Sequence, residues 1–254
     1  MIQRLLPFFS LIILFAGLSL ASPNFLTTTN LSSVVRQTAV INIMSLGMTL
    51  IIVSGGIDLS VGAILAMGGL FGTMAMAKGS SIAVGVLIGV LTGLGCGVVN
   101  GVLTTFLQIN PFIVTLGTLG IFRGTALMVS NGLPVHEIPQ SFAFLGEGNL
   151  FHVPFVLYIL LVCAVVMHIV LEHTRHGRYA FAIGSNPNAA FYAGIPVRFH
   201  VTGVYTIGGM LTGLAGMIEA SRLMTGQPTA GQSYELQAIA AVVIGGGSLQ
   251  GGEG

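Results

Sequence analysis

The sequence predicts an all-α protein, a polytopic bundle of transmembrane helices in which some helices are interrupted. Charged residues make up only 6% of the 254 residues, whereas about 25% is usual in a soluble domain. Hydrophobic residues make up 54% of the chain, and many gather in stretches of about 20, the length that spans a bilayer. Lipid accepts such an apolar exterior. The net charge of +1 gives no basis for nucleic acid binding.

The N-terminal stretch has two interpretations. Residues 5–20 are apolar and follow Arg4, and Leu20-Ala21-Ser22 offers small residues for cleavage, so the segment resembles a secretory signal peptide. A cleaved signal would be expected before a soluble secreted body. Because the rest of the chain is as apolar as its start, we favour an uncleaved first transmembrane helix.

Apolar stretches then repeat along the whole chain, separated by short polar connections. Each is long enough, or nearly so, to form a membrane span. The sequence therefore predicts seven complete spanning helices and an eighth that reaches the end of the chain. Their ranges are about 5–21, 38–54, 60–77, 81–106, 111–130, 153–171 and 200–220, with the eighth opening near 236.

The basic residues predict the orientation, because cytoplasmic loops carry an excess of Lys and Arg. With Arg4 inside, alternation of the spans places the 172–199 connection inside as well. The 131–152 connection then lies outside, and it contains two glutamates and no Lys or Arg. The 172–199 connection is the densest basic stretch of the chain, with Arg175, Arg178 and Arg198.

Glycine recurs every four residues in the fourth predicted span. On a helix this spacing forms one bare stripe, which lets another backbone approach closely. We therefore expect close helix–helix packing along the stripe, which consists of Gly85, Gly89, Gly93, Gly97 and Gly101.

Two segments, 54–62 and 244–252, look like interruptions of helices. Each follows an apolar run and holds several glycines, which let the backbone leave the helix and free its polar groups for other partners. Transporters use such breaks in related halves of a fold to build their pathway. Because the chain contains 37 glycines, chance similarity between the two segments is the alternative to a structural repeat.

Asp58 is the only acidic residue between Met1 and His136. It follows a Gly-Gly pair between two apolar segments, and a carboxylate at such depth is costly unless it is paired or hydrated. Two roles fit equally well. Asp58 either caps the N-terminus of the next helix or acts as a gate or pathway residue, together with the nearby Ser60.

Three further polar residues are candidates for the substrate pathway or its gate. Arg123 lies inside the fifth apolar stretch, where an arginine faces the bundle interior or reaches an interface; structural hydrogen bonding is its alternative role. Glu235 precedes the last apolar run, where a helix dipole can simply stabilise its carboxylate. Asn110, with Pro111, marks the start of the fifth span.

Motifs of catalysis are missing. A P-loop requires Gly-Lys-Ser/Thr, but the only lysine, Lys78, follows Ala77. The chain contains no His-Glu-x-x-His, and no Gly-x-Ser-x-Gly elbow stands out. We therefore expect no catalytic residue, no cofactor and no metal site, and if ATP powers the protein, a separate subunit hydrolyses it.

Several stretches together resemble the permease subunits of bacterial ribose-type sugar ABC transporters. They run in order over most of the chain, from near residue 40 to its end. The first and last are specific to that family. The matching stretches are 47–62 (GMTLIIVSGGIDLSVG), 110–117 (NPFIVTLG), Arg123-Gly124, 174–184 (TRHGRYAFAIG), 188–194 (NAAFYAG) and 234–252 (YELQAIAAVVIGGGSLQGG).

The resemblance implies a function and partners. It implies that residues 1–254 form one transmembrane permease domain in the bacterial inner membrane, which carries a ribose-like pentose or hexose. It also implies a cytoplasmic ATP-binding subunit, a periplasmic sugar-binding protein and a second permease subunit, identical or different, in the lipid bilayer. Family members continue for two or three more spans, so the chain is expected to be C-terminally truncated.

The resemblance also implies that a coupling element to the ATPase lies in the 172–199 connection. Local sequence fits this, because Asn-Pro starts a short helix and Gly-Ile-Pro ends it. Phe191 and Tyr192 would insert into a groove on the ATPase. The element consists of Asn186, Pro187, Asn188, Ala189, Ala190, Phe191, Tyr192, Ala193 and Gly194.

Two functions of other classes compete with the importer subunit. An ion-coupled secondary transporter would need several intramembrane carboxylates or histidines for coupling. Asp58 alone is weak evidence for such a mechanism. A structural membrane subunit that transports nothing is the second alternative. A neighbouring ATPase gene and a gene for a secreted sugar-binding protein would favour the importer.

Overall fold

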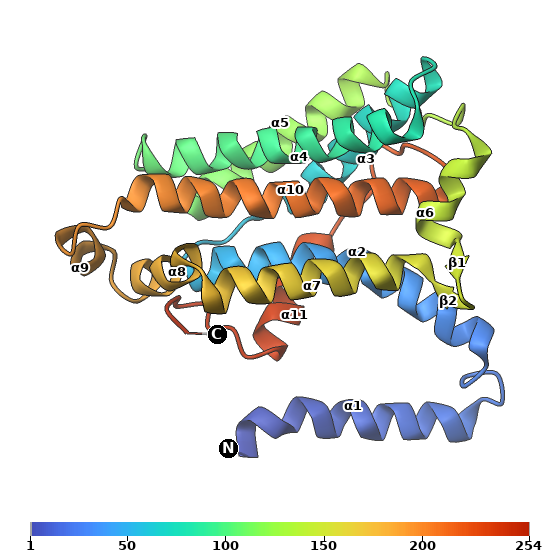
Figure 1. Cartoon of the computed structure of the whole chain (residues 1–254), viewed down its shortest axis with the longest axis horizontal. Coiled ribbons are helices and arrows are strands. Elements are labelled where there is room, and N and C mark those ends of the chain that lie inside the picture. Colours follow the sequence, from blue (N-terminus) through green and yellow to red (C-terminus); the bar gives the residue numbers. More distant parts are fainter. Residues whose placement is uncertain (1, 254) are drawn as a thin grey trace.

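The computed structural model describes residues 2–253, with side chains from Phe9 onward, as an all-α bundle of long helices (Figure 1). This confirms the predicted fold class. The eight apolar helices are α1 (Ile2–Ala21), α2 (Thr28–Val53), α3 (Val61–Ala77), α4 (Ile82–Thr105), α5 (Pro111–Val129), α7 (Phe155–His173), α10 (Val197–Leu223) and α11 (Tyr234–Ile244). The short elements are η1 (Gln140–Ala143), α6 (Phe144–Glu147), the hairpin strands β1 (Asn149–Leu150) and β2 (Val153–Pro154), α8 (Arg175–Ser185) and α9 (Pro187–Tyr192).

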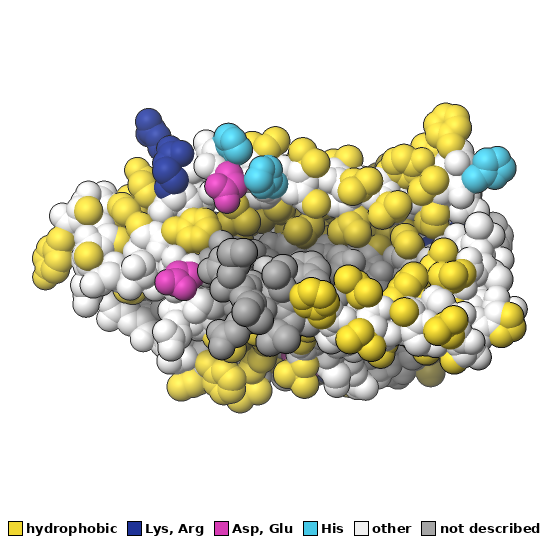
Figure 2. Space-filling model, turned by 90° about the horizontal axis from the view of Figure 1, so that it is seen from below, with side chains coloured by type: hydrophobic (Ala, Val, Ile, Leu, Met, Phe, Trp, Pro, Cys, Tyr) yellow, Lys and Arg dark blue, Asp and Glu magenta, His cyan; other side chains and the backbone are white. Residues whose placement is uncertain are grey.

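Helices α2, α4, α5, α7 and α10 are each long and apolar enough to cross a membrane. Shorter apolar helices cover residues 9–21, 61–77 and 234–244. All eight predicted spans therefore correspond to helices, and the chain is a multi-pass membrane protein. On the face in Figure 2, hydrophobic side chains cover much of the described surface, and most of the basic side chains in view lie toward the left end, as expected for a surface that meets lipid.

One boundary and one additional helix differ from the sequence prediction. Helix α2 begins at Thr28, well before the predicted start at 38, because the Thr27 hydroxyl caps it by accepting the Asn30 backbone N–H over 3.3 Å. Besides the predicted coupling helix, the 172–199 connection contains α8, for which the sequence analysis made no prediction. Helix α8 buries small and apolar residues, Gly177, Ala180 and Ile183, against the bundle.

Helix α10 forms the centre of the bundle. It packs against α4, α3 and α2. Figure 1 shows it between the layer that contains α4 and the layer of α2 and α7. Its buried residues run from Val204 to Ser221. The main apolar core joins α10 to α2, which contributes fully buried residues such as Ile43 and Ile51. Helix α1, in contrast, lies apart from the bundle in Figure 1, and its described side chains are mostly exposed.

The glycine stripe of α4 lies where α4 meets α3 and α10. A Cβ atom built on Gly93 would contact the carbonyl oxygen of Gly209 and lie 2.7 Å from the Cα of Gly213. Gly97 and Gly101 face α10 in the same way, and Gly85 and Gly89 face carbonyl oxygens of α3. These backbones pack closely because α4 carries no side chain at the contact, and at Gly93 the facing Gly209 and Gly213 carry none either.

The two ends of the bundle are built differently, and we name them by their short elements. The α9 end comprises residues 54–60, 106–110, 174–200 and 245–253. The hairpin end comprises residues 22–36, 131–154 and 222–226, where Arg36 donates hydrogen bonds to the Glu147 carbonyl over 3.0 Å and to Asn149 Oδ1 over 2.9 Å. Residues 227–233 turn back into the bundle, since a Cβ built on Gly62 would contact the carbonyl oxygen of Gly231. Connections expected on opposite sides of the membrane thus lie at opposite ends (Figure 1).

Candidate functional site

The chain leaves the helix between α2 and α3. Gly55 has φ +84°, a left-handed conformation that glycine adopts without strain. Gly56 has no room for a side chain, because a Cβ there would lie 2.5 Å from the Tyr205 hydroxyl. The carbonyl oxygen of Ile57, freed by the break, accepts hydrogen bonds from Thr115 Oγ1 over 3.2 Å and from the Tyr205 hydroxyl over 3.4 Å. Side chains of α5 and α10 therefore replace the missing helical partners.

The Asp58 carboxylate lies inside the break and is fully buried. Its Oδ1 accepts from the Ser60 backbone nitrogen over 2.8 Å and from the Ser60 hydroxyl over 2.6 Å. Its Oδ2 accepts from Asn100 Nδ2 over 3.2 Å. No basic side chain forms an ion pair with Asp58 in the part of the chain that the structure describes. Hydrogen bonds alone thus compensate for the burial of this side chain.

Asp58 helps to start α3, but not as the capping residue itself. The N-cap position is occupied by Ser60, whose own side chain makes no capping hydrogen bond. Asp58 instead closes a turn onto Ser60 two residues later, the local bond that short polar side chains commonly make. The capping role predicted from the sequence is therefore indirect.

The Asp58 contacts continue into α4 and α5. Asn100 Nδ2 also donates to the Ser60 hydroxyl over 2.8 Å, and Thr118 Oγ1 donates to Asn100 Oδ1 over 2.7 Å. All four side chains are buried. We call Asp58, Ser60, Asn100 and Thr118 the polar bridge. Because three elements meet in it, a movement of any one of them must break or rearrange its hydrogen bonds.

Asn100 and Thr118 were missed by the sequence-based selection. Asn100 had a signal of its own, since it is the only amide inside the apolar 81–106 stretch, and polar residues at such depth usually bond to another helix. Thr118 had none, because threonines are common in these helices and most bond to their own backbone, as Thr125 does to the Ile121 carbonyl.

Arg123 and Glu235 make no hydrogen bond with the polar bridge and instead lie at the connection between α10 and α11. Arg123 Nη1 donates to the carbonyl oxygens of Pro228 and Ala230, over 2.8 and 2.7 Å, so it holds the connection between α10 and α11. Glu235 lies in the first turn of α11, and a Cβ built on Gly62 would lie 2.8 Å from its Oε2 atom. Its carboxylate thus sits beside the first turn of α3, where the helix dipole stabilises a negative charge.

Asn110 caps α5, since its Oδ1 accepts the Phe112 backbone N–H over 2.9 Å. At the same end of the molecule, α9 lies where the sequence predicts a short helix. Asn186 Oδ1 accepts the Ala189 N–H over 3.0 Å, and Gly194 ends the helix with φ +82°. The side chains of Phe191 and Tyr192 are 66% and 86% exposed, so both aromatic rings are available to a partner.

The second glycine-rich segment, 244–252, packs against the end of α2 and the start of the first segment, 54–62. Gly252 donates its backbone N–H to the Val53 carbonyl over 2.9 Å, and a Cβ on Gly251 would lie 2.8 Å from the Cα of Gly55. Gly246, Gly251 and Gly252 all have positive φ. The two predicted interruptions therefore lie side by side at the α9 end, each just after an apolar helix.

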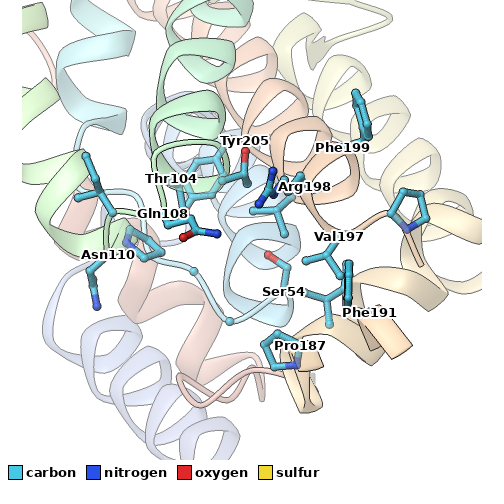
Figure 3. A pocket seen from close by; sticks show the side chains of 18 of the residues that line it. Ser54, Thr104, Gln108, Asn110, Pro187, Phe191, Val197, Arg198, Phe199 and Tyr205 are labelled. Carbon is cyan, nitrogen blue, oxygen red and sulfur yellow. The ribbon is translucent and has the colours of Figure 1, made fainter. Parts of the chain in front are cut away.

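A cavity of about 900 Å³ opens beside the first glycine-rich segment (Figure 3). Its walls are the end of α2, the α4–α5 connection, α9 and the first turns of α10. Polar lining residues include Ser54, Thr104, Gln108, Asn110 and Arg198. Gly55, Gly56 and Tyr205 also line it, so the cavity reaches the break that holds the polar bridge.

Comparisons with known proteins identify a family. Residues 30–252 match the family model described as the permease component of a branched-chain amino acid transport system. The ribose import permease RbsC of Bacillus subtilis is 40% identical over 254 residues, which cover 99% of this chain and 79% of that protein. No solved structure gives a significant match.

Other similar proteins are also named as sugar permeases. RbsC of Escherichia coli K12 is 41% identical over 96% of this chain and 78% of its own length. The D-allose permease AlsC of the same strain is 38% identical over 97% of this chain and 76% of its own length.

Proposed function

We propose that this chain, which belongs to the family of branched-chain amino acid transport system permease components, is the membrane permease subunit of an ATP-driven importer for a monosaccharide. The observation that carries the proposal is its similarity, over nearly its whole length, to permeases named for ribose and allose import. The bundle of apolar helices and the polar cavity at its α9 end support it.

The α9 end faces the cytoplasm in this proposal, and the membrane is the bacterial inner membrane. Arg175, Arg178 and Arg198 all lie at this end, and a cytoplasmic position for them follows the positive-inside rule. The hairpin end then faces the periplasm, where it meets a sugar-binding protein. Residues 1–254 act as one transmembrane domain, because α2, α3, α4 and α10 share one set of packing contacts.

ATP is hydrolysed by a separate cytoplasmic subunit, because this chain carries no P-loop lysine. Helix α9 is the coupling element that receives the motion of that subunit. Its support is the exposure of Phe191 and Tyr192 and its contacts with α8 and α10, through which a displacement of α9 can reach the bundle. A second permease subunit, identical or different, completes the pathway within the bilayer.

The break after α2 is the gate of the pathway, and the polar bridge holds it closed. Asp58 and Ser60 belong to this bridge, which ties the break to α4 and α5. Arg123 and Glu235 fix the α10–α11 connection and the start of α11 beside it. Asn110 fixes the start of α5 at the inner mouth.

Reconstitution tests this function directly. The full-length permease is placed in proteoliposomes with its ATPase and its binding protein, and uptake of labelled D-ribose, D-allose and L-arabinose is followed. We expect uptake of at least one sugar that requires ATP and the binding protein and persists when ionophores collapse ion gradients. Uptake that follows an ion gradient without ATP would instead identify a secondary transporter, and no uptake of any sugar would contradict the proposal.

A further inference from the structure

Two histidines that lie far apart in the sequence face each other at the α9 end. His176 belongs to α8, and His200, 24 positions later, belongs to the first turn of α10. Their Nδ1 atoms are 3.1 Å apart, and their ring centroids are 4.9 Å apart. The sequence predicted no metal site, because no local pattern indicates that these two side chains meet.

The two Nδ1 atoms need a positive centre between them. A neutral imidazole carries one N–H and one lone pair, and two lone pairs facing each other at this distance repel. Either one Nδ1 carries a proton and donates it to the other, or a metal ion accepts both lone pairs. Imidazole nitrogens are favoured ligands of Zn²⁺, Ni²⁺ and Cu²⁺ in proteins.

The geometry of the pair fits a shared metal ion. Zinc binds a histidine nitrogen at about 2.0–2.1 Å, so two nitrogens on one ion lie about 3.3 Å apart in a tetrahedral shell and about 2.9 Å apart in an octahedral one. The observed 3.1 Å lies between these values. Two rings that both point at such an ion have centroids about 4.8 Å apart, close to the observed 4.9 Å. A straight N–H···N bond of the same length would place the centroids about 5.4 Å apart.

The surroundings hold the pair in place and leave it open to solvent. Tyr179, three residues after His176 on α8, makes a T-shaped ring contact with His200, with 4.7 Å between centroids. His176 is exposed and His200 is partly exposed, so an ion can enter. No third His, Cys, Asp or Glu side chain joins the pair in the part of the chain that the structure describes. Water therefore completes the coordination shell, as it does in metal sites that keep an open position.

We propose that His176 and His200 together bind one divalent transition-metal ion, Zn²⁺ or Ni²⁺, through their Nδ1 atoms. The ion links α8 to α10, and α9 lies between these two helices along the chain and contacts both. Occupancy of the site therefore fixes both ends of the segment that carries α9. Mg²⁺ does not bind there, because it prefers oxygen ligands. The site does not depend on the transport function proposed above.

Titration with metal ions tests the site. The permease is purified in detergent without a polyhistidine tag, stripped of metal with EDTA, freed of EDTA, and titrated in a calorimeter with Zn²⁺, Ni²⁺ or Mg²⁺. We expect saturable binding of one Zn²⁺ or one Ni²⁺ per permease and no binding of Mg²⁺. At an ion concentration of about five times Kd, the Tm should rise by about 2–4 °C, because the ion binds the folded state.

Variants assign the binding to the two rings. His176→Gln and His200→Gln each keep an amide that can hydrogen-bond to the remaining imidazole but remove one metal ligand. Each should weaken ion binding at least about 10-fold, since changes even outside the ligand set commonly cost 10- to 100-fold. His173→Gln is the matched control. The His173 ring packs against His168 instead, with 5.7 Å between centroids, so this variant should keep both the binding and the Tm shift.

Three results would overturn the inference. They are the absence of saturable Zn²⁺ or Ni²⁺ binding by the unmodified chain, binding that His176→Gln and His200→Gln leave unchanged, and an equal loss of binding in His173→Gln. The Tm of each metal-free variant reports whether it folds. If His200→Gln does not fold, His176→Gln decides the question alone, because its side chain is exposed.

Discussion

The Asn100 side chain donates a hydrogen bond to the buried Asp58 carboxylate, with 3.2 Å between Nδ2 and Oδ2. These residues are 42 positions apart in sequence and belong to two elements, the break after α2 and the C-terminal part of the glycine-rich α4. The contact therefore links the non-helical break after α2 to a helix that packs closely against α3 and α10. If the break acts as a gate, this hydrogen bond must be broken when the gate opens.

Exchange of the two side chains tests this contact. Asp58→Asn presents a donor where the neighbouring groups need an acceptor, and we expect it to cost about 1–3 kcal/mol of stability. Adding Asn100→Asp restores a donor–acceptor pair and should recover part of that loss. Asp58→Leu removes every acceptor and should impair uptake more than Asp58→Asn does.

A double-mutant cycle on the full-length protein gives the measurement. Unfolding in detergent and sugar uptake are recorded for both single variants and for the exchange variant. Effects that simply add, with no recovery in the double variant, would mean that the two side chains are energetically independent. Normal uptake by Asp58→Leu at normal expression would remove Asp58 from the gate.

The glycine stripe makes a prediction with a control on the same helix. Gly93→Ala places a methyl group against the Gly209 carbonyl and 2.7 Å from the Gly213 Cα, so we expect about 1–3 kcal/mol of destabilisation from overpacking. Gly95 has no atom within 4 Å of an added Cβ. Gly95→Ala should therefore be neutral or stabilise the helix by up to about 1 kcal/mol. Equal losses for both variants in a thermal unfolding assay would refute close packing at the stripe.

Arg123 is predicted to hold the α10–α11 connection in place. Arg123→Leu deprives the carbonyls of Pro228 and Ala230 of a charged donor, and such a bond is worth about 1.5–3 kcal/mol. Backbone amides of residues 227–233 should then exchange hydrogen at least about 10-fold faster. Thr125→Val, which removes only a bond within α5, should leave that exchange unchanged. Unaltered protection in Arg123→Leu would show that the connection is held by other contacts.

Much of the fold could be predicted from the sequence because the membrane imposes its own length scale. Eight apolar stretches gave eight helices, and the Asn186-Pro187 start and Gly194 stop identified α9, since both signals are local. Helix α8 was missed because it contains Gly177 and mixes charged with apolar residues over only 11 positions. The hairpin of β1 and β2, two residues per strand, lies below the length at which a strand pattern can be recognised.

The candidate site was predictable only in part. Asp58 was evident because it is isolated among apolar residues. Its partners depend on how α4 and α5 pack onto the break, and no local pattern encodes that contact. The cavity is a further example, since Gln108 and Arg198 are 90 positions apart and meet only when the start of α10 returns to the end of α4. The sequence also could not show that segments 54–62 and 244–252 lie next to each other. Their contact depends on the folded structure, and the sequence alone left chance similarity between them as an alternative to a repeat.

The exposed aromatic pair of α9 is predicted to anchor the ATPase. Replacing both Phe191 and Tyr192 by Ala should leave membrane insertion intact, because neither side chain packs in the core. Truncating an anchor residue commonly costs about 2 kcal/mol or more, roughly 30-fold in affinity. We therefore expect less co-purifying ATPase and loss of uptake. Phe151→Ala, an aromatic that is 83% exposed at the hairpin end, is the matched control. Full ATPase binding by the double variant would refute the anchoring role.

Site-specific cross-linking tests the central claim most directly, namely that the α9 end is the cytoplasmic, ATPase-binding end of a permease. Tyr192→Cys and Leu133→Cys place exposed thiols at opposite ends, at positions that are 86% and 66% exposed, in a protein whose own Cys96 and Cys163 are buried. A thiol-to-amine reagent applied to the full complex should join Tyr192→Cys, and not Leu133→Cys, to the ATPase. Cross-linking of the ATPase through Leu133→Cys instead would contradict the orientation and the coupling role of α9 together.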